Sequence, residues 1–375
     1  MTAELPIGTR LGTDDPAHLL APRLNRHTFW CGQSGSGKTY ALGVLLEQVL
    51  LHTRLPLVIL DPNSDFVSLG RTRPGIAPEL AEEFTSRDIR VCRRSPGDGD
   101  PLHVRFVDMN LASRAAVMQI DPIADADDFN AMLRGEERLR GALAQIDDAL
   151  LAGQRSGLRP SLVHWLRTQT DPEFERLAIR LENLGIADWQ LWAWGQTALP
   201  DIIDERPDTT VIDLGGFDTA DEPRAAALAV LDHLWARRHD RIGRLIVIDE
   251  AHNLCSPAPA TPIERLLTER IVQIAAEGRK YGLWLLMSTQ RPSKVHPNAL
   301  SQCDNLGLMR MSSPRDLAEL GSVFGYAPDE LRSRATSFAQ GEVLFAGGFA
   351  PEPMLVQVGA RLTEEGGSDV PIPLR

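Results

Sequence analysis

Apolar residues follow two patterns along this chain, and each pattern predicts one kind of element. Short apolar runs of strand length lie at residues 28–31, 57–60, 211–214, 245–248 and 283–287. Such continuous runs are typical of strands that are buried on both faces of a parallel sheet. Between them, apolar residues recur at helical spacing, most clearly in residues 40–50 and 224–237. The alternation predicts an α/β fold with a mainly parallel central sheet.

The middle of the chain departs from this alternation. Residues 89–92 and 104–107 have the composition of further strands on either side of a turn rich in Gly and Asp at residues 96–101. From about residue 125 to about residue 200 the apolar spacing becomes helical. We therefore expect four parts: the N-terminal part of a core domain over residues 1–124, an inserted α-helical subdomain over 125–200, the C-terminal part of the core over 201–360, and a tail over 361–375.

The overall composition limits the classes of function. The 375 residues carry a net charge of −12, which argues against a protein that coats polyanions but does not exclude a locally basic channel. Residues 1–10 have no basic segment leading into an apolar one, and no apolar run approaches the ~18 residues that a membrane span needs. The four cysteines lack paired C-x-x-C spacing and predict reduced, mostly buried thiols: Cys31, Cys92, Cys255 and Cys303. These features favour a cytoplasmic protein.

Residues 32–39 fill the pattern G-x-x-x-x-G-K-[ST] between an apolar run and a predicted helix. Glycines let the backbone bend so that successive amide hydrogens point at phosphate groups, a lysine reaches the β- and γ-oxygens, and a threonine hydroxyl binds Mg²⁺. The alternative is a chance glycine-rich turn, which would not explain Lys38 and Thr39 at these positions. The sequence therefore predicts that ATP is bound by Gly32, Gln33, Ser34, Gly35, Ser36, Gly37, Lys38, Thr39 and Tyr40, and that Thr39 is also a ligand of Mg²⁺.

A second group of polar residues follows the apolar run that ends at Ile248. Asp249 emerges at the end of this predicted strand and is expected to hold Mg²⁺ through water, whereas Glu250 is placed to orient and deprotonate the attacking water. The run 57–60 delivers Asp61 to the same edge of the sheet in the same way. His252 is compatible either with a contact to the site or with local packing.

Hydrolysis also requires groups that stabilise the charge developing on the γ-phosphate. Gln290 follows the apolar run 283–287 and is expected beside Asp249, because consecutive strands are usually neighbours. The alternative is a polar residue that merely ends a strand. Arg279 ends a predicted helix just before that run, where a cation is also favoured by the helix dipole alone.

Taken together, these blocks resemble the HerA-like branch of the HerA/FtsK superfamily of RecA-like motor ATPases. The resemblance covers roughly residues 6–358, and its specific part is the pair of blocks at residues 277–282 and 288–293. It implies a ring, usually a hexamer, with ATP between subunits and DNA threaded through the centre. It also implies Gln290 as a sensor, Arg26 as a same-subunit sensor near the γ-phosphate, and Arg279 as the arginine supplied to the ATP of a neighbour.

The resemblance has one gap, since HerA translocases carry a long N-terminal β-barrel and only residues 1–31 precede the phosphate loop. We expect an ATP-hydrolysing DNA translocase or helicase, coupled to a nuclease or another effector. The alternative is a regulatory or scaffolding ATPase that assembles a partner such as an anti-phage effector, or a motor for protein or conjugative secretion. A small-molecule kinase is disfavoured because Glu250 and Gln290 suit the activation of water.

Two further sets of residues bear on nucleic-acid contact. Basic clusters at residues 90–94, 134–140 and 237–244 are candidates for contacts to DNA, although each contains or adjoins acids. The first cluster is the preferred pore loop, and the end of a helix is the simpler reading of the last one. We expect four tryptophans to form a small helical core instead of a base-stacking surface: Trp165, Trp189, Trp192 and Trp194.

Overall fold

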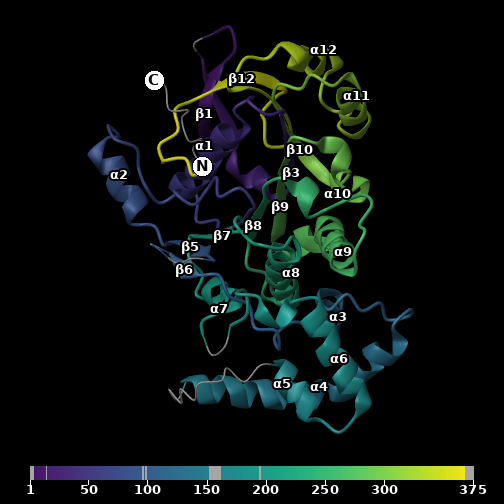
Figure 1. Ribbon diagram of the computed structural model, residues 1–375. Coiled ribbons are helices and arrows are strands. Elements are labelled where there is room, and N and C mark those ends of the chain that lie inside the picture. Colours follow the sequence, from purple (N-terminus) through teal and green to yellow (C-terminus); the bar gives the residue numbers. More distant parts are fainter. Residues whose placement is uncertain are drawn as a thin grey trace, which may run out of the picture.

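The apolar runs of the sequence lie side by side in one large β-sheet (Figure 1). The computed structural model describes residues 4–13, 15–94, 97, 99–151, 162–193 and 196–367. Within them the sheet has twelve strands in the order β2-β1-β12-β11-β10-β3-β9-β8-β4-β7-β5-β6. Their bounds are Glu4–Arg10 (β1), Pro16–Leu20 (β2), His27–Cys31 (β3), Leu57–Asp61 (β4), Ile89–Arg93 (β5), Asp100–Pro101 (β6), Thr209–Asp213 (β7), Arg244–Ile248 (β8), Leu283–Thr289 (β9), Cys303–Leu308 (β10), Glu342–Gly347 (β11) and Met354–Val358 (β12).

The eight strands from β10 to β6 are parallel to one another. The α/β fold with a mainly parallel sheet is therefore confirmed. Because parallel strands all end at the same edge, the residues that follow β3, β4, β8 and β9 gather there. The opposite edge collects the residues that precede these strands.

The sheet extends further than the sequence indicated, through the antiparallel strands β11, β12, β1 and β2. In this part the first strand of the chain pairs with the last, as Gly8 lies opposite Val358. A Cβ atom at Gly8 would lie only 2.1 Å from the carbonyl oxygen of Gln357, so this close approach requires glycine. The pairs β1–β2 and β11–β12 each join neighbouring strands of the chain, whereas the pairing of β1 with β12 joins segments that are far apart in sequence.

Different helices cover the two faces of the sheet. Residues alternate along β4, so that Leu57 and Ile59 join the apolar cluster containing α1, whereas Val58 and Leu60 join the cluster containing α8 and α9. The helix bounds are Lys38–His52 (α1), Pro78–Thr85 (α2), Leu111–Val117 (α3), Ala126–Leu151 (α4), Leu162–Thr168 (α5), Pro172–Asn183 (α6), Leu199–Asp204 (α7), Asp221–Ala236 (α8), Pro262–Glu277 (α9), Pro297–Leu300 (α10), Pro314–Val323 (α11) and Asp329–Ser333 (α12).

Helices α4, α5 and α6 form a group at one end of the molecule, next to α3 (Figure 1). Trp189 and Trp192 are buried there and stack with ring centroids 5.6 Å apart, and the edge of Phe106 meets Trp192. Trp165 packs against Phe174 in the same way. The packing role is therefore confirmed for these three tryptophans, whereas Trp194 lies outside the described residues.

Two expectations about secondary structure are wrong. Residues 104–107 were expected to form a strand, but only Val104 makes a single parallel bridge, to Trp192, before the chain turns. A tail was expected from residue 361, but Arg361 and Thr363 are 1% and 0% exposed, because residues 361–367 pack across α1. Residues 368–375 lie outside the described residues. In residues 104–107 the apolar side chains pack inward from a loop. The spacing of apolar residues in the sequence does not distinguish such a loop from a strand.

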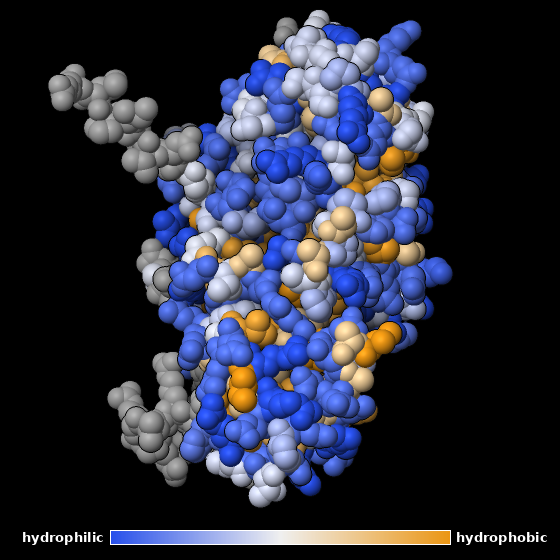
Figure 2. Space-filling model, turned by 45° about the vertical axis from the view of Figure 1, so that its right-hand side comes forward, coloured by the Kyte–Doolittle hydropathy of each residue, from blue (hydrophilic) through white to orange (hydrophobic). Residues whose placement is uncertain are grey.

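The surface is mainly hydrophilic on the face that Figure 2 presents, with apolar side chains in small separate groups. Among the described residues, no helix combines the length and the apolar character that crossing a lipid bilayer requires.

Candidate functional site

The glycine-rich loop lies between the end of β3 and the start of α1. Gly35 and Gly37 have φ angles of 73° and 87°, which L side chains rarely adopt. The loop is held from outside by hydrogen bonds from the Gln33 amide to the Arg310 carbonyl (2.8 Å) and from the Gly341 amide to the Ser36 carbonyl (2.9 Å). The amides at the N-terminus of α1 remain directed at the loop, so the segment has the form of an anion-binding cradle.

The lysine of the loop is held by the two predicted carboxylates. The Nζ atom of Lys38 lies 3.0 Å from Asp249 Oδ1 and 3.1 Å from Glu250 Oε1, and it donates to Ser288 Oγ at 2.9 Å. Burial alone would lower the pKa of Lys38, but the charges of Asp249 and Glu250 outweigh burial and raise it. Lys38 is therefore a firmly protonated cation that links the two carboxylates after β8 to Ser288 near the end of β9.

Glu250 is held in its ionised form by its neighbours. Burial opposes its ionisation, yet the hydrogen bond from His252 and the charge of Lys38 bring its pKa down to about 2. The Nδ1 atom of His252 lies 3.1 Å from Glu250 Oε2 and 3.0 Å from Thr289 Oγ1, so His252 contacts the site instead of only packing locally. Gln290 lies next to Glu250, with its backbone N–H donating to Glu250 Oε2 at 3.4 Å.

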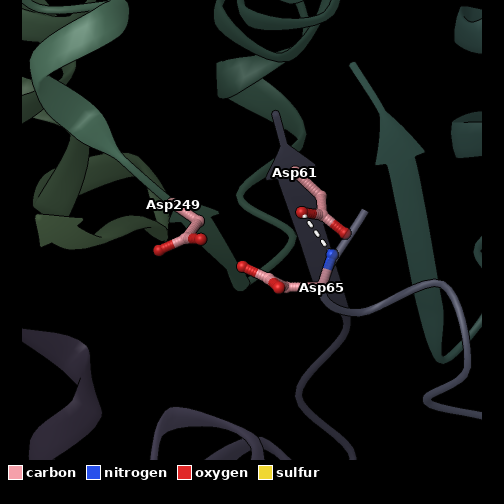
Figure 3. Close-up of side chains that lie close together, drawn as sticks. All are labelled: Asp61, Asp65 and Asp249. Carbon is pink, nitrogen blue, oxygen red and sulfur yellow. Dashed lines mark hydrogen bonds between the residues drawn. The ribbon is translucent and has the colours of Figure 1, made fainter. Parts of the chain in front are cut away.

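Three aspartates converge where β4 and β8 end (Figure 3). Their carboxylates, from Asp61, Asp65 and Asp249, all lie within 4.8 Å of one another. Asp61 accepts hydrogen bonds from the amides of Asp65 (3.0 Å) and Phe66 (2.8 Å), which fixes the turn after β4. Burial raises the pKa of Asp61 to about 7 and that of Asp65 to about 6, and the charge of Asp249 adds to both.

This donor set fits Mg²⁺, which prefers carboxylate and hydroxyl oxygens. Asp249 is fully buried and its Oδ2 atom has no hydrogen-bond partner among the described residues. Thr39 Oγ1 lies 3.4 Å from Asp65 Oδ2 and so reaches the same space. Thr39 and Asp249 were predicted from the sequence, whereas Asp65 was not. The signal that could have identified Asp65 is a second acid four residues after the strand-ending Asp61.

An open cleft of about 740 Å³ runs from these residues along the loop. Beyond the residues predicted from sequence, its walls include Arg73, Gln340 and residues 365–367. Arg73 lies over the ring of Tyr40 at 5.4 Å and pairs with Glu365 at 2.6 Å. No local motif marks these residues. The predicted residues that line the cleft are Gln33, Ser34, Gly35, Gly37, Lys38, Thr39, Tyr40, Glu250 and Gln290.

The C-terminal wall of the cleft is anchored to α1. The carboxylate of Glu47 accepts hydrogen bonds from the amides of Leu362 and Thr363 (2.8 Å each) and from the Thr363 hydroxyl (2.5 Å). Arg361 Nε lies 3.6 Å from the same carboxylate, and both side chains are fully buried. A buried charged network therefore holds the segment that borders the nucleotide cleft.

The two predicted arginines lie at the opposite edge of the sheet. Arg26 directly precedes β3, so the five residues of that strand, at about 3.3 Å each, separate it from the phosphate loop by roughly 16 Å. Arg279 precedes β9, whereas Gln290 follows it. Both arginines share Asp304, with Nη1 of Arg279 at 2.5 Å and Nε of Arg26 at 3.7 Å.

This placement contradicts the prediction that Arg26 senses the γ-phosphate of its own subunit. The reason is strand direction: a residue before a parallel strand and a loop after it cannot meet at one edge. The side chains of Arg26 and Arg279 are 42% and 35% exposed, so both remain accessible from outside the chain.

Two of the three basic clusters considered for DNA contact are largely engaged by carboxylates. The preferred pore-loop cluster is fully paired: Arg90 with Asp88 and Glu205, Arg93 with Asp213, and Arg94 with Asp218. In the second cluster, Arg134 and Arg138 pair with Glu173 and Asp171, and the side chain of Arg140 lies outside the described part of the chain. These pairs are features of a solvated surface in this structure.

Part of the chain is similar in sequence to known proteins. Residues 5–135 match the family model described as the central domain of helicase HerA. A DNA double-strand break repair helicase HerA of Sulfurisphaera tokodaii is 30% identical over 125 residues, which are 33% of this chain and 24% of that protein. The matched part thus spans about a quarter of the length of this curated relative.

The fold is similar to solved structures over nearly the whole chain. VirB4 of Thermoanaerobacter pseudethanolicus matches with a TM-score of 0.58 and 16% identity, over 96% of this chain and 97% of that one. The plasmid coupling protein TrwB, in complex with ADP and Mg²⁺, matches with a TM-score of 0.58 and 14% identity, over 92% of this chain and 88% of that one. Residues 5–135 are thus similar in sequence to the central domain of helicase HerA, and the chain has the mainly parallel α/β fold of VirB4 and TrwB.

Proposed function

We propose that this chain is an ATP-hydrolysing subunit of a ring motor that translocates DNA, and that its active site is completed by a neighbouring subunit. One observation carries the proposal: the hydrolytic residues Lys38, Glu250 and Gln290 lie at one edge of the sheet, whereas Arg26 and Arg279 lie at the other. Phosphoryl transfer needs a cation at the developing charge, and an arginine from another subunit is a common source.

The chemistry follows from the positions of the side chains. The phosphates of ATP take Lys38 away from Asp249 and Glu250, and the loop amides bind the phosphate oxygens. Once Lys38 has moved to the phosphates, one of the charges that lower the pKa of Glu250 is gone, so its ionised carboxylate becomes more basic and accepts a proton from a water that Gln290 helps to orient. Thr39, Asp65 and Asp249 would hold Mg²⁺, which supplies positive charge at the β- and γ-oxygens.

Arg279 and Arg26 of one subunit would reach the ATP of the next and stabilise the charge on its γ-phosphate. Asp304 neutralises both arginines while no phosphate is opposite them. We also propose that the helices between residues 125 and 200 are an insertion into the ATPase core, since α4 and α6 pack mainly on each other and on α3 and α5.

Mixing two inactive variants tests whether the active site is shared between neighbouring subunits. Arg279→Ala and Glu250→Gln are each expected to lower kcat by at least about 10³-fold when present alone. In an equal mixture, roughly a quarter of the interfaces combine an intact Glu250 with an intact Arg279 of the neighbour, so activity should return to a measurable fraction. Lys280→Ala, the adjacent exposed cation, serves as the matched control. No recovery in well-mixed assemblies would exclude the role of Arg279 in trans.

DNA translocation is tested separately by displacement of the third strand from a triplex. The expected result is ATP-dependent displacement together with stimulation of ATP hydrolysis by duplex DNA. If neither occurs while the ATPase remains active, the DNA motor is excluded, and a scaffolding or secretion ATPase becomes the better assignment. The similarity of the fold to VirB4 and TrwB supports the assignment to this class of ATPase.

A further inference from the structure

A second, smaller pocket lies at the edge of the sheet opposite the phosphate loop, where β8 begins and α7 and α8 end. Its volume is about 80 Å³. The charged groups around it are the guanidinium groups of four arginines and two carboxylates: Arg206, Arg237, Arg238, Arg244, Asp204 and Asp240. In a chain whose net charge is −12, this pocket therefore has an excess of positive charge.

The carboxylates leave most of these arginines unpaired. Asp204 binds His233 at 2.9 Å and Arg237 at 2.5 Å. Arg206, Arg238 and Arg244 make no ion pair with a carboxylate in the part of the chain that the structure describes. Arginines such as Arg90, Arg93, Arg94 and Arg279 each pair with a carboxylate. Three arginines without a carboxylate partner around one pocket therefore require an explanation.

Arg244 is the clearest example of a cation in this pocket without a carboxylate partner. It is only 5% exposed, and its hydrogen bond within the described residues is from Nη2 to the Ile203 carbonyl at 3.0 Å. A buried guanidinium loses its hydration, and this loss is unfavourable unless an anion compensates it. Arg238 is fixed beside it, with its guanidinium over the rings of Trp235 (4.7 Å) and Tyr281 (5.6 Å) and its buried Nε without a partner.

A simpler function for these arginines is to compensate the negative ends of α7 and α8. Exposed cations such as Arg237 are sufficient for that function, since the dipole acts at the surface. It does not require Arg244 to be withdrawn from water, nor Arg238 to be held flat with a buried donor unpaired.

We propose that this pocket binds one tetrahedral oxyanion of the phosphate class, either free or as a phosphate of a nucleic-acid backbone. Guanidinium groups bind such oxyanions through charge-assisted hydrogen bonds in a fixed planar geometry. The volume of about 80 Å³ admits a single phosphate group and excludes a nucleoside. The site is separate from the ATP cleft, and the proposal is independent of the proposed motor activity.

Thermal unfolding in phosphate and in chloride at equal ionic strength tests the site. The measurement uses the Lys38→Ala background, which weakens phosphate binding at the loop. Phosphate is expected to raise Tm, and Arg206→Gln to reduce that rise by at least half, because Arg206 is exposed and its replacement spares the core. Arg241→Gln, an exposed arginine that does not line the pocket, is the matched control. Equal protection of both variants would overturn the proposal.

Binding of duplex DNA at several salt concentrations distinguishes the two sources of phosphate. If the pocket binds the DNA backbone, Arg206→Gln lowers the slope of log Kd against log salt by about 1, and Arg241→Gln does not. If the slope is unchanged while phosphate protection is lost, the ligand is free phosphate. If Arg206→Gln matches Arg241→Gln in both measurements, the pocket is not an anion site.

Discussion

Replacing Glu47 by glutamine tests whether the C-terminal wall of the nucleotide cleft is held by a buried charge. The carboxylate of Glu47 accepts three hydrogen bonds from residues 362 and 363 and lies 3.6 Å from Arg361 Nε. Both charged side chains are fully buried. The glutamine has nearly the same shape but carries no charge and replaces one acceptor oxygen by a donor, so Arg361 is left buried and uncompensated.

The expected loss of stability follows from this burial. Breaking a buried ion pair from one side costs about 3–5 kcal/mol, mostly because the remaining charge is left without a partner. Glutamine retains one oxygen for the amides, and burial already raises the pKa of Glu47, so we expect the lower end, about 3 kcal/mol. An exposed pair should behave differently: Glu83→Gln, which removes the partner of Arg87 on α2, should cost less than about 0.5 kcal/mol.

Urea unfolding measures both variants through the midpoint and the m value. The double variant Glu47→Gln/Arg361→Met removes both charges and should recover at least about 1 kcal/mol relative to the single variant. Nucleotide affinity should also fall in the single variant, because residues 365–367 line the cleft. A Glu47→Gln protein within about 1 kcal/mol of the unaltered chain, with unchanged nucleotide affinity, would refute the reasoning.

Three further predictions concern the phosphate loop, its acids and its helix. Lys38→Ala should weaken nucleotide binding, whereas Glu250→Gln should bind ATP but hydrolyse it at least about 10³-fold more slowly, which binding and single-turnover assays separate; normal hydrolysis would remove Glu250 from the mechanism. Because burial raises the pKa of Asp61 to about 7 and that of Asp65 to about 6, the folded state binds more protons than the unfolded state between about pH 4 and 7. Stability without nucleotide should therefore fall as the pH rises through this window, and urea midpoints should show a smaller fall in Asp65→Asn; an unchanged profile would contradict this. Gly43→Ala in α1 should lower Tm, although this change is usually stabilising in a helix, because the new Cβ would lie 2.6 Å from Arg361 Cζ; a higher Tm would contradict the packing.

The parts of the site that could be predicted are those that depend on a short stretch of sequence. Lys38 and Thr39 belong to one loop, and Asp249, Glu250 and Gln290 each follow an apolar run. Parallel strands bring the ends of such runs together without any further information. The same rule, applied to the residues before the strands, would have placed Arg26 and Arg279 at the opposite edge.

The remaining parts depend on contacts between distant segments. Glu47 and Thr363 are 316 residues apart in sequence, and neither belongs to a recognisable motif. Polar residues at the end of the chain look like a tail, because composition does not reveal that a buried carboxylate holds them. Gly43 and Glu47 are buried on α1. A small residue and an acidic residue at buried positions of this helix are the local signals that the C-terminal segment packs against it.

The bridge formed by Lys38 has a consequence for the affinity of the site. An incoming nucleotide must replace two carboxylates that already neutralise this lysine, so part of its binding energy is offset by the contacts that are lost. The same carboxylates recapture Lys38 when the products leave. We therefore expect an internal competitor for the phosphates, which limits the affinity for ADP and speeds its exchange. Fast emptying of each site is a property that a cyclic motor requires.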